Sequence, residues 1–258
     1  MSELVLYEAR PPAAVITLNR ADKRNALNRA LIAALTEAFR RARDDDKARC
    51  VLLTGAGTVF CAGMDLAELS ELLKEKQEAG EVWDTALHLA RLYELIFTLP
   101  RPTIAVINGA AVAGGAGLVT VCDLALSVPE ARFGYPEVRR GLVAAMVMPH
   151  LLRHVGERLA RYLLLTGELV DAAEALRLGL INEVVPANQI MDKAMDWARA
   201  IAQGGPLALV QTKLFLQQVS RATLTVEEGA KGSLGPRLTE ECRQGLQAFF
   251  AKQPPPWA

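Results

Sequence analysis

The sequence predicts an α/β fold with a helical C-terminal region, and three observations lead to that class. Residues Cys50–Thr54 form a continuous apolar run, which is typical of a buried parallel strand. Strand and helix patterns then alternate through the middle of the chain, as in the crossover units of a parallel sheet. After about residue 145 helical patterns dominate. The chain has 258 residues, so we expect an α/β core over residues 1–195 and a helical C-terminal region over 196–258.

The first elements expected are a hairpin and an amphipathic helix. Leu4–Glu8 and Ala14–Leu18 have strand composition, and Pro11-Pro12 between them predicts the turn. A helix is expected over Asn25–Arg43, because apolar side chains recur there at every fourth position: Leu27, Leu31, Leu35 and Phe39.

The middle of the chain contains a polar segment from Glu68 to Glu81, with Gly80 as a breaker. The segment is either a mobile helical flap or a plain exposed helix, and the sequence leaves that choice open. Beyond it we expect a helix over Trp83–Leu99, then a strand over Thr103–Gly109. The glycine-rich stretch Ala113–Leu118 is expected to open a short helix.

The remaining expected elements are few. Leu124–Val128 predicts another strand, and the apolar segment Leu180–Val185 interrupts the later helical patterns. Pro254-Pro255-Pro256 predicts a frayed tail.

Composition excludes several classes of protein. Hydrophobic residues make up 51% and charged residues 22% of the chain, as in ordinary globular domains, and the formal net charge is zero. A nucleic-acid surface normally needs a basic excess, so no nucleic-acid partner is expected. No apolar run reaches the length of a membrane span. The four cysteines lack CxxC spacing, so we expect a reduced, cytoplasmic setting and no metal site.

Common catalytic motifs are also missing. The sequence has no P-loop and no GxSxG elbow. Gly55-Ala56-Gly57 begins like a dinucleotide fingerprint, but Phe60 stands where the third glycine belongs. His150 and His154 have the spacing of a metal pair without the general-base glutamate of HExxH, and we interpret them as helix residues.

Two glycine-containing loops each lead from a predicted strand toward a helix. One is Phe60–Leu66, after the strand at Cys50–Thr54, and the other is Ala113–Leu118. Helix N-termini offer unpaired N–H groups, so two such loops on adjacent strands could form an oxyanion hole. The alternative, which the residues leave open, is that small side chains only allow tight helix–sheet packing.

The motifs themselves are more specific. Phe60–Leu66 (FCAGMDL), Ile107–Leu118 (INGAAVAGGAGL) and Cys122-Asp123 together resemble the enoyl-CoA hydratase/isomerase (crotonase) family. Further matching segments follow in order over nearly the whole chain: Leu18-Asn19-Arg20, Lys23–Asn28, Ala131–Glu137, Leu165–Gly167, Asp171-Ala172, Gly179–Ile181, Ala248-Phe249 and Lys252.

The resemblance implies a fold, a substrate and an assembly. The family fold is a spiral of ββα units with a helical C-terminal region that closes the coenzyme A site and mediates assembly into trimers or dimers of trimers. Its substrates are acyl-CoA thioesters, so coenzyme A is part of the substrate and no cofactor is implied. The backbone N–H groups of Met64 and Gly114 match the two oxyanion donors, which would stabilise enolate charge on the thioester oxygen.

The resemblance also implies contacts with coenzyme A. Lys23, Arg24 and Ala26 match the segment near the adenine, and Ala62 matches a position beside the pantetheine. Asp65, Leu66, Gly115 and Gly117 belong to the two loops and are included as substrate-binding positions. Phe249 and Lys252 match a C-terminal site that, in relatives, reaches the coenzyme A of a neighbouring subunit. For Lys23, Arg24 and Lys252, a solvated surface charge remains the alternative.

Acid–base chemistry is where the chain departs from the family pattern. Hydratases with two catalytic glutamates carry the first one three residues beyond the second oxyanion glycine, which is Gly117 here. The second glutamate is present as Glu137. Its apolar neighbours Phe133, Tyr135, Leu142 and Val143 favour a raised pKa, which suits a group that passes a proton both ways.

A single carboxylate leaves the reaction open. It suits isomerisation of a 3-enoyl-CoA to a 2-enoyl-CoA, whereas water addition more commonly uses two. Relatives that hydrate branched acyl-CoAs, such as methylglutaconyl-type substrates, nevertheless show a similar Gly-Leu and keep the second glutamate. We therefore expect an enoyl-CoA hydratase acting on 2-enoyl-CoA, branched acyl groups included, with the isomerase as the alternative.

Two further alternatives remain. One is a decarboxylase, thioester hydrolase or dehalogenase on the same scaffold, for which Gly117 would leave room for a bulkier acyl group. The other is an acyl-CoA-binding homologue without catalysis.

Overall fold

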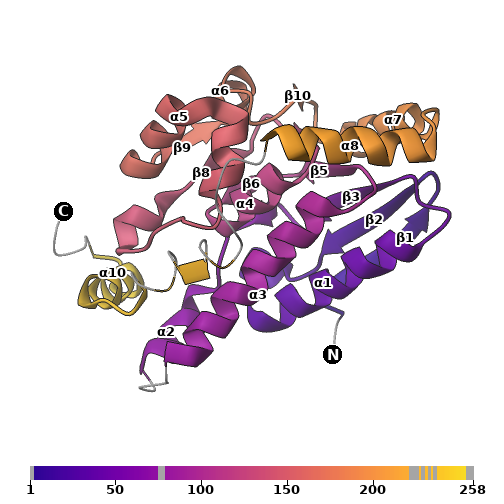
Figure 1. The fold of residues 1–258 in the computed structure, drawn as a ribbon. Helices are drawn as coiled ribbons and strands as arrows, with labels where there is room; N and C mark the ends of the chain where they lie inside the picture. Colours follow the sequence, from indigo (N-terminus) through magenta and orange to yellow (C-terminus); the bar gives the residue numbers. More distant parts are fainter. Residues whose placement is uncertain are drawn as a thin grey trace.

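Two β-sheets form the centre of the protein, and helices surround them (Figure 1). The computed structural model describes residues 3–74, 79–220, 227, 230, 231, 234 and 237–253. Within these residues a six-stranded sheet has the order β1-β2-β3-β5-β7-β10, and a four-stranded sheet has the order β4-β6-β8-β9. The strands of the larger sheet are β1 (Val5–Arg10), β2 (Ala13–Leu18), β3 (Cys50–Gly55), β5 (Thr103–Ile107), β7 (Leu124–Ser127) and β10 (Glu183–Val184). Those of the smaller sheet are β4 (Val59–Cys61), β6 (Ala110–Val112), β8 (Arg132–Gly134) and β9 (Leu169–Asp171).

The larger sheet follows the predicted strands closely. β1 and β2 pair antiparallel, so the hairpin around Pro11-Pro12 is confirmed. β3 pairs parallel to both β2 and β5, and all of its residues are buried, as the apolar run predicts. The last strand, β10, lies within the apolar segment Leu180–Val185, for which the sequence analysis named no strand.

The sequence did not locate the strands of the smaller sheet, which supply the second strand of the ββα units that the resemblance implies. After each of β3, β5 and β7 the chain adds a short strand to the smaller sheet, namely β4, β6 and β8. A helix follows each strand pair, which gives repeated ββα units and confirms the predicted α/β fold. The turn between the sheets is tight at Gly109, where a Cβ would lie 2.0 Å from the carbonyl oxygen of Thr58.

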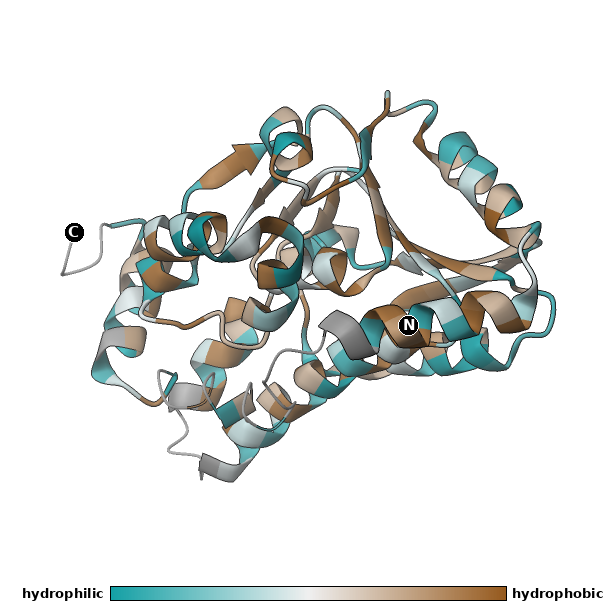
Figure 2. Ribbon diagram, turned by 45° about the horizontal axis from the view of Figure 1, so that its top comes forward, coloured by the Kyte–Doolittle hydropathy of each residue, from teal (hydrophilic) through white to brown (hydrophobic). Residues whose placement is uncertain are grey.

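The described helices cover both faces of the larger sheet. Those that precede β9 are α1 (Arg29–Asp44), α2 (Leu66–Lys74), α3 (Ala79–Thr98), α4 (Gly114–Val121) and α5 (Met148–Thr166), with the 3-10 helices η1 (Ala21–Lys23) and η2 (Pro136–Arg140). Those after it are α6 (Ala172–Arg177), α7 (Ile190–Ala202), α8 (Pro206–Ser220) and α10 (Glu240–Ala251). Helix α7 packs on β3, β5 and β7, whereas α1 packs on β1 and β2 from the other side (Figure 1). The helices carry both hydrophilic and hydrophobic residues along their length, as expected where one side of a helix faces the sheets (Figure 2).

Two predicted helix boundaries are wrong. Helix α1 begins at Arg29 rather than Asn25, because the Asn28 side chain caps it by accepting a hydrogen bond from Leu31 N at 2.9 Å. Gly80 does not break a helix; it lies in the first turn of α3, which begins four residues before Trp83.

Other expectations are only partly addressed. Residues 75–78 of the polar segment and the proline tail at 254–256 lie outside the described residues. Helix α7 spans residue 195, and the division of the chain there stays a prediction. Among the described helices, none has the length and apolar character needed to cross a membrane.

Candidate active site

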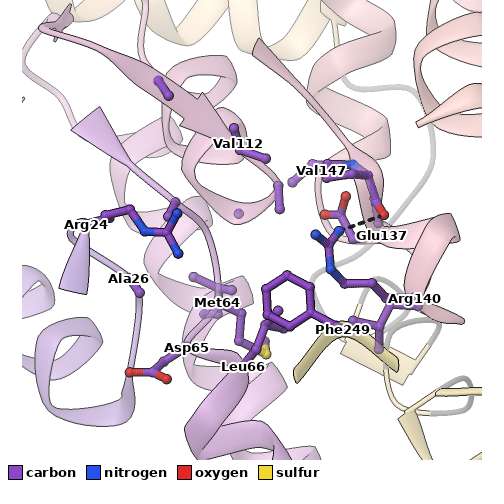
Figure 3. A pocket seen from close by; sticks show the side chains of 18 of the residues that line it. Arg24, Ala26, Met64, Asp65, Leu66, Val112, Glu137, Arg140, Val147 and Phe249 are labelled. Carbon is purple, nitrogen blue, oxygen red and sulfur yellow. Dashed lines mark hydrogen bonds between the residues drawn. The ribbon is translucent and has the colours of Figure 1, made fainter. Parts of the chain in front are cut away.

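A cavity of about 580 Å³ lies between the two sheets' loops and the C-terminal helix α10. Most of the predicted site residues line it, and Figure 3 shows several of them around the space. The predicted residues in its wall are Lys23, Arg24, Ala26, Ala62, Met64, Asp65, Leu66, Gly114, Glu137 and Phe249. Gly115, Gly117 and Lys252 do not line it.

The two glycine loops meet at this cavity. Gly63 has φ +88°, and a Cβ added there would lie 3.1 Å from Gly114 N and 2.8 Å from Val112 O. Gly115 is equally constrained, because a Cβ at that residue would lie 2.1 Å from Cys61 O. The small residues thus allow the loops to touch, so the tight-packing interpretation is correct for Gly115. Contact between the loops also brings the backbones of Met64 and Gly114 to one place.

The backbone N–H groups of Met64 and Gly114 have no hydrogen-bond acceptor among the described residues. Met64 forms a parallel bridge with Leu27, in which Leu27 N donates to Gly63 O at 2.7 Å and Asp65 N donates to Leu27 O at 3.0 Å. Gly114 is the first residue of α4, where helix N–H groups lack intrahelical partners. Within the described residues, no hydrogen bond uses Met64 N or Gly114 N. Two donors in the wall of one cavity are what a developing oxyanion requires.

The backbone around Gly114 is held in an unusual conformation. Ala113 has φ +53°, which is rare for a residue with a Cβ and persists only where the surrounding structure holds the backbone in place. Ala113 N donates to Gly134 O of β8 at 2.8 Å, and Gly117 N donates to Ala113 O at 3.0 Å. Hydrogen bonds therefore hold the backbone of Ala113 through both its N–H and its carbonyl group, and the carbonyl belongs to the peptide group that carries Gly114 N.

Glu137 enters the cavity from η2. Its Oε2 atom is buried and has no hydrogen-bond partner among the described residues. Burial raises the pKa of the Glu137 carboxyl from 4.5 to about 7, although the positive charges of Arg140 and Arg237 oppose that change. This value agrees with the raised pKa expected from the sequence. A carboxyl with such a pKa suits a group that accepts and returns protons near neutral pH.

Gly117 lies behind the cavity wall, next to a tyrosine that the sequence did not reveal. A Cβ at Gly117 would lie 2.5 Å from Tyr93 Oη and 2.6 Å from Val147 Cγ1. Tyr93, from α3, is buried, and its hydroxyl donates to Gly114 O at 2.7 Å. Burial raises the pKa of Tyr93 well above its usual value, so the phenol stays neutral. The expectation that Gly117 leaves room for a bulkier acyl group is therefore wrong, because Tyr93 and Val147 fill that space.

The cationic side of the cavity is built on η1. Lys23 and Arg24 are exposed at its rim, and Arg24 O accepts from Ala62 N at 3.0 Å. Asn25 anchors this loop: its buried side chain accepts from Arg20 N and donates to Ala56 O and Val59 O. The cations thus border a polar opening, where an anionic group could bind.

The Asp65 side chain forms an ion pair and two hydrogen bonds within the protein. It pairs with Arg20 at 2.6 Å, and its Oδ1 atom accepts from Ala67 N and Glu68 N at the start of α2. Asp65 therefore fixes the loop that carries Met64.

The C-terminal helix α10 closes the cavity on the side of Glu137. Phe249 lines the cavity of its own chain, with the guanidinium carbon of Arg140 4.7 Å from its ring centroid. Lys252 is the C-cap residue of α10, exposed and away from the cavity wall. Whether either residue reaches a neighbouring subunit stays a prediction.

The histidines have other contacts. His154 Nε2 lies 2.9 Å from Thr120 O, and His150 packs edge-on against Phe97. Burial lowers the pKa of His150 to about 3. Across the part of the chain that the structure describes, no group of three or more potential metal-ligating side chains is found.

Comparison with known proteins gives consistent results along the whole chain. A model of the family described as "Enoyl-CoA hydratase/isomerase" matches residues 9–258. A Thermus thermophilus protein described as an enoyl-CoA hydratase is 41% identical over 246 residues, which cover 94% of this chain and 96% of that one. The 2,3-dehydroadipyl-CoA hydratase of Escherichia coli is 33% identical, with 99% and 98% covered. The crystal structure of an enoyl-CoA hydratase from Mycobacterium avium superimposes with a TM-score of 0.85 at 32% identity, covering all of both chains.

Proposed function

Because the chain belongs to the enoyl-CoA hydratase/isomerase (crotonase) family, we propose that it hydrates 2-enoyl-CoA thioesters with Glu137 as the single acid–base residue. The observation that carries the proposal is one cavity that is lined by a buried carboxyl of pKa about 7 and by two N–H groups without an acceptor among the described residues. Branched 2-enoyl groups belong to the proposed range.

In the proposed mechanism Glu137 first accepts a proton and then returns it, while two N–H groups stabilise negative charge. Met64 N and Gly114 N donate to the thioester oxygen. Ionised Glu137 takes a proton from water while the water oxygen bonds to C3 of the acyl chain. The electron pair of the C2=C3 bond moves toward the thioester oxygen, where the two N–H groups stabilise the enolate. Glu137 then returns the proton to C2, which leaves a 3-hydroxyacyl-CoA and restores the carboxylate.

Tyr93 supports this arrangement without acting as a base. Its raised pKa keeps the phenol protonated, so it cannot accept the proton of water at neutral pH. Its hydrogen bond to Gly114 O instead holds the loop that supplies one of the two donors.

Isomerisation of 3-enoyl-CoA to 2-enoyl-CoA is the second candidate. It is favoured by the missing carboxylate at Gly117, since moving a proton between C2 and C4 needs one base. The filled space beside Gly117 removes the argument for a decarboxylase or thioester hydrolase that rested on a bulkier acyl group.

The test compares crotonyl-CoA with 3-hexenoyl-CoA, using wild type and Glu137→Gln. Hydratase activity consumes the conjugated ultraviolet absorbance of crotonyl-CoA, whereas isomerase activity creates it from 3-hexenoyl-CoA. Glutamine cannot carry the proton, so the variant should lose about 100-fold or more in kcat. The matched control is Glu130→Gln, an exposed glutamate that keeps wild-type turnover. Equal kcat for Glu137→Gln and wild type would contradict the proposed role.

A homotrimer or dimer of trimers is part of the same proposal. It is supported by exposed apolar side chains along α8, including Leu207 at 79%, Leu216 at 65% and Phe215 at 61% exposure. Such residues on one helix are typical of a covered surface. Sedimentation of wild type and of Phe215→Glu tests it: the variant should dissociate, and a wild-type monomer would contradict it.

A further inference from the structure

Arg237 is a buried cation in the cavity wall that sequence analysis did not identify. It precedes α10, lines the cavity and is only 3% exposed. Within the described residues no hydrogen bond or ion pair uses its guanidinium group, and the Nη1 atom is fully buried without a partner.

A buried guanidinium nitrogen without a partner is costly. A buried charge normally has an ion-pair or hydrogen-bond partner, because removing it from water is unfavourable. Burial lowers the pKa of Arg237 to about 10, so the group still carries its charge at neutral pH. Among the described residues, no acidic side chain forms an ion pair with this cation, so an anionic ligand could do so.

Glu137 does not supply that anion. It influences Arg237 electrostatically, but no ion pair joins the two side chains. Glu137 itself is only partly ionised near neutral pH. Its carboxyl must also exchange protons in the proposed reaction, which a direct salt bridge to Arg237 would hinder.

The position of Arg237 points to the acyl end of the substrate. Besides Glu137, the groups that influence it are Tyr93 and Cys242. Tyr93 contacts the Gly114 loop, and Arg237 lines the same cavity as Tyr93 and the proposed oxyanion donors. The rim residue Arg24 lies on the side of the cavity opposite Glu137 and Arg140 (Figure 3). The rim cations Lys23 and Arg24 suit the phosphates of coenzyme A, whereas Arg237 is buried in the cavity wall.

We propose that Arg237 binds a carboxylate carried by the acyl group, so that the preferred substrates are acyl-CoA thioesters of dicarboxylic acids. This inference rests on the proposed function, because it assumes that the acyl chain occupies this cavity. A guanidinium suits the task, since its planar N–H donors match a carboxylate in pairs.

The experiment measures binding without catalysis. Saturated thioesters cannot be hydrated, so isothermal titration of the full-length protein compares three pairs of equal chain length: succinyl- with butyryl-CoA, glutaryl- with pentanoyl-CoA, and adipyl- with hexanoyl-CoA. Wild type should bind the carboxylated member of at least one pair about tenfold more tightly. Arg237→Met should abolish that ratio, and Arg237→Lys should retain part of it.

The matched control is Arg243→Met, an exposed arginine of α10 that pairs with Glu240 and should keep the wild-type ratio. Equal binding within all three pairs by wild type would overturn the inference without any variant. So would an Arg237→Met protein that loses the same factor for both members of a pair, because that result points to the coenzyme A moiety. A binding preference without turnover of 2-enoyl-CoA would refute the proposed hydratase while leaving the anion site standing.

Discussion

Replacing Glu137 by glutamine should stabilise the folded protein at alkaline pH and have little effect at acid pH. The carboxyl has a pKa of about 7 in the fold, against 4.5 as its usual value. The folded state therefore holds a proton between these two values that the unfolded chain has already released. By linkage, stability falls as pH rises through this window and then levels off above about pH 7.

The magnitude of this stability change follows from the difference between the two pKa values. That difference is roughly two and a half pKa units, and each unit corresponds to about 1.4 kcal/mol, so ionised Glu137 costs the fold about 3 kcal/mol. A neutral glutamine of the same shape avoids that cost. The difference in unfolding free energy between Glu137→Gln and wild type should thus grow by about 2 to 3 kcal/mol between pH 5 and pH 8.

Urea unfolding at fixed protein concentration, followed by circular dichroism at both pH values, provides the measurement. Glu130→Gln, on an exposed glutamate, serves as the control and should show no such growth. The reasoning is refuted if the stability difference is the same at pH 5 and pH 8. That result would mean that Glu137 ionises in the fold as easily as in the unfolded chain.

Three more outcomes are expected. Because hydration needs ionised Glu137, kcat/KM for crotonyl-CoA should rise with pH up to about 7, and a profile that is flat between pH 5 and 8 would contradict this. Gly117→Glu should destabilise the fold by about 2 kcal/mol or more in urea unfolding, since the new side chain meets Tyr93. Gly80→Glu is the control, because a Cβ there meets nothing within 4 Å. Equal unfolding free energies for the two variants would contradict the packing described. Asn25→Ala should cost about 2 to 3 kcal/mol by the same measurement, because it removes a buried side chain with three hydrogen bonds, and a loss below about 0.5 kcal/mol would show that the loop does not depend on it.

The larger sheet could be predicted from the sequence because its strands carry strong signals. β3 is an unbroken apolar run, and β1 with β2 flanks a proline turn. The smaller sheet could not, since each of its strands has three residues. A strand of that length offers no alternation to recognise, and it exists because neighbouring strands and the Gly109 turn place it.

The site divides in the same way. The glycine loops and Glu137 could be predicted because their motifs are local and contiguous. Tyr93 could not, because within α3 it reads as one more buried helix residue. Arg237 belongs to no motif that the sequence analysis recognised. Its place in the cavity wall, near enough to Glu137 to influence its charge, is known only from the structure.

The hydrogen bond from Gly117 N to Ala113 O has an electronic consequence. The Ala113 carbonyl and the Gly114 N–H belong to one conjugated amide, so a donor at the oxygen withdraws electron density from the nitrogen. Chains of hydrogen bonds polarise one another in this way by roughly 10–30% per bond. Residue 117, which has no side chain to offer the reaction, can still make the Gly114 N–H a stronger acid toward the thioester oxygen.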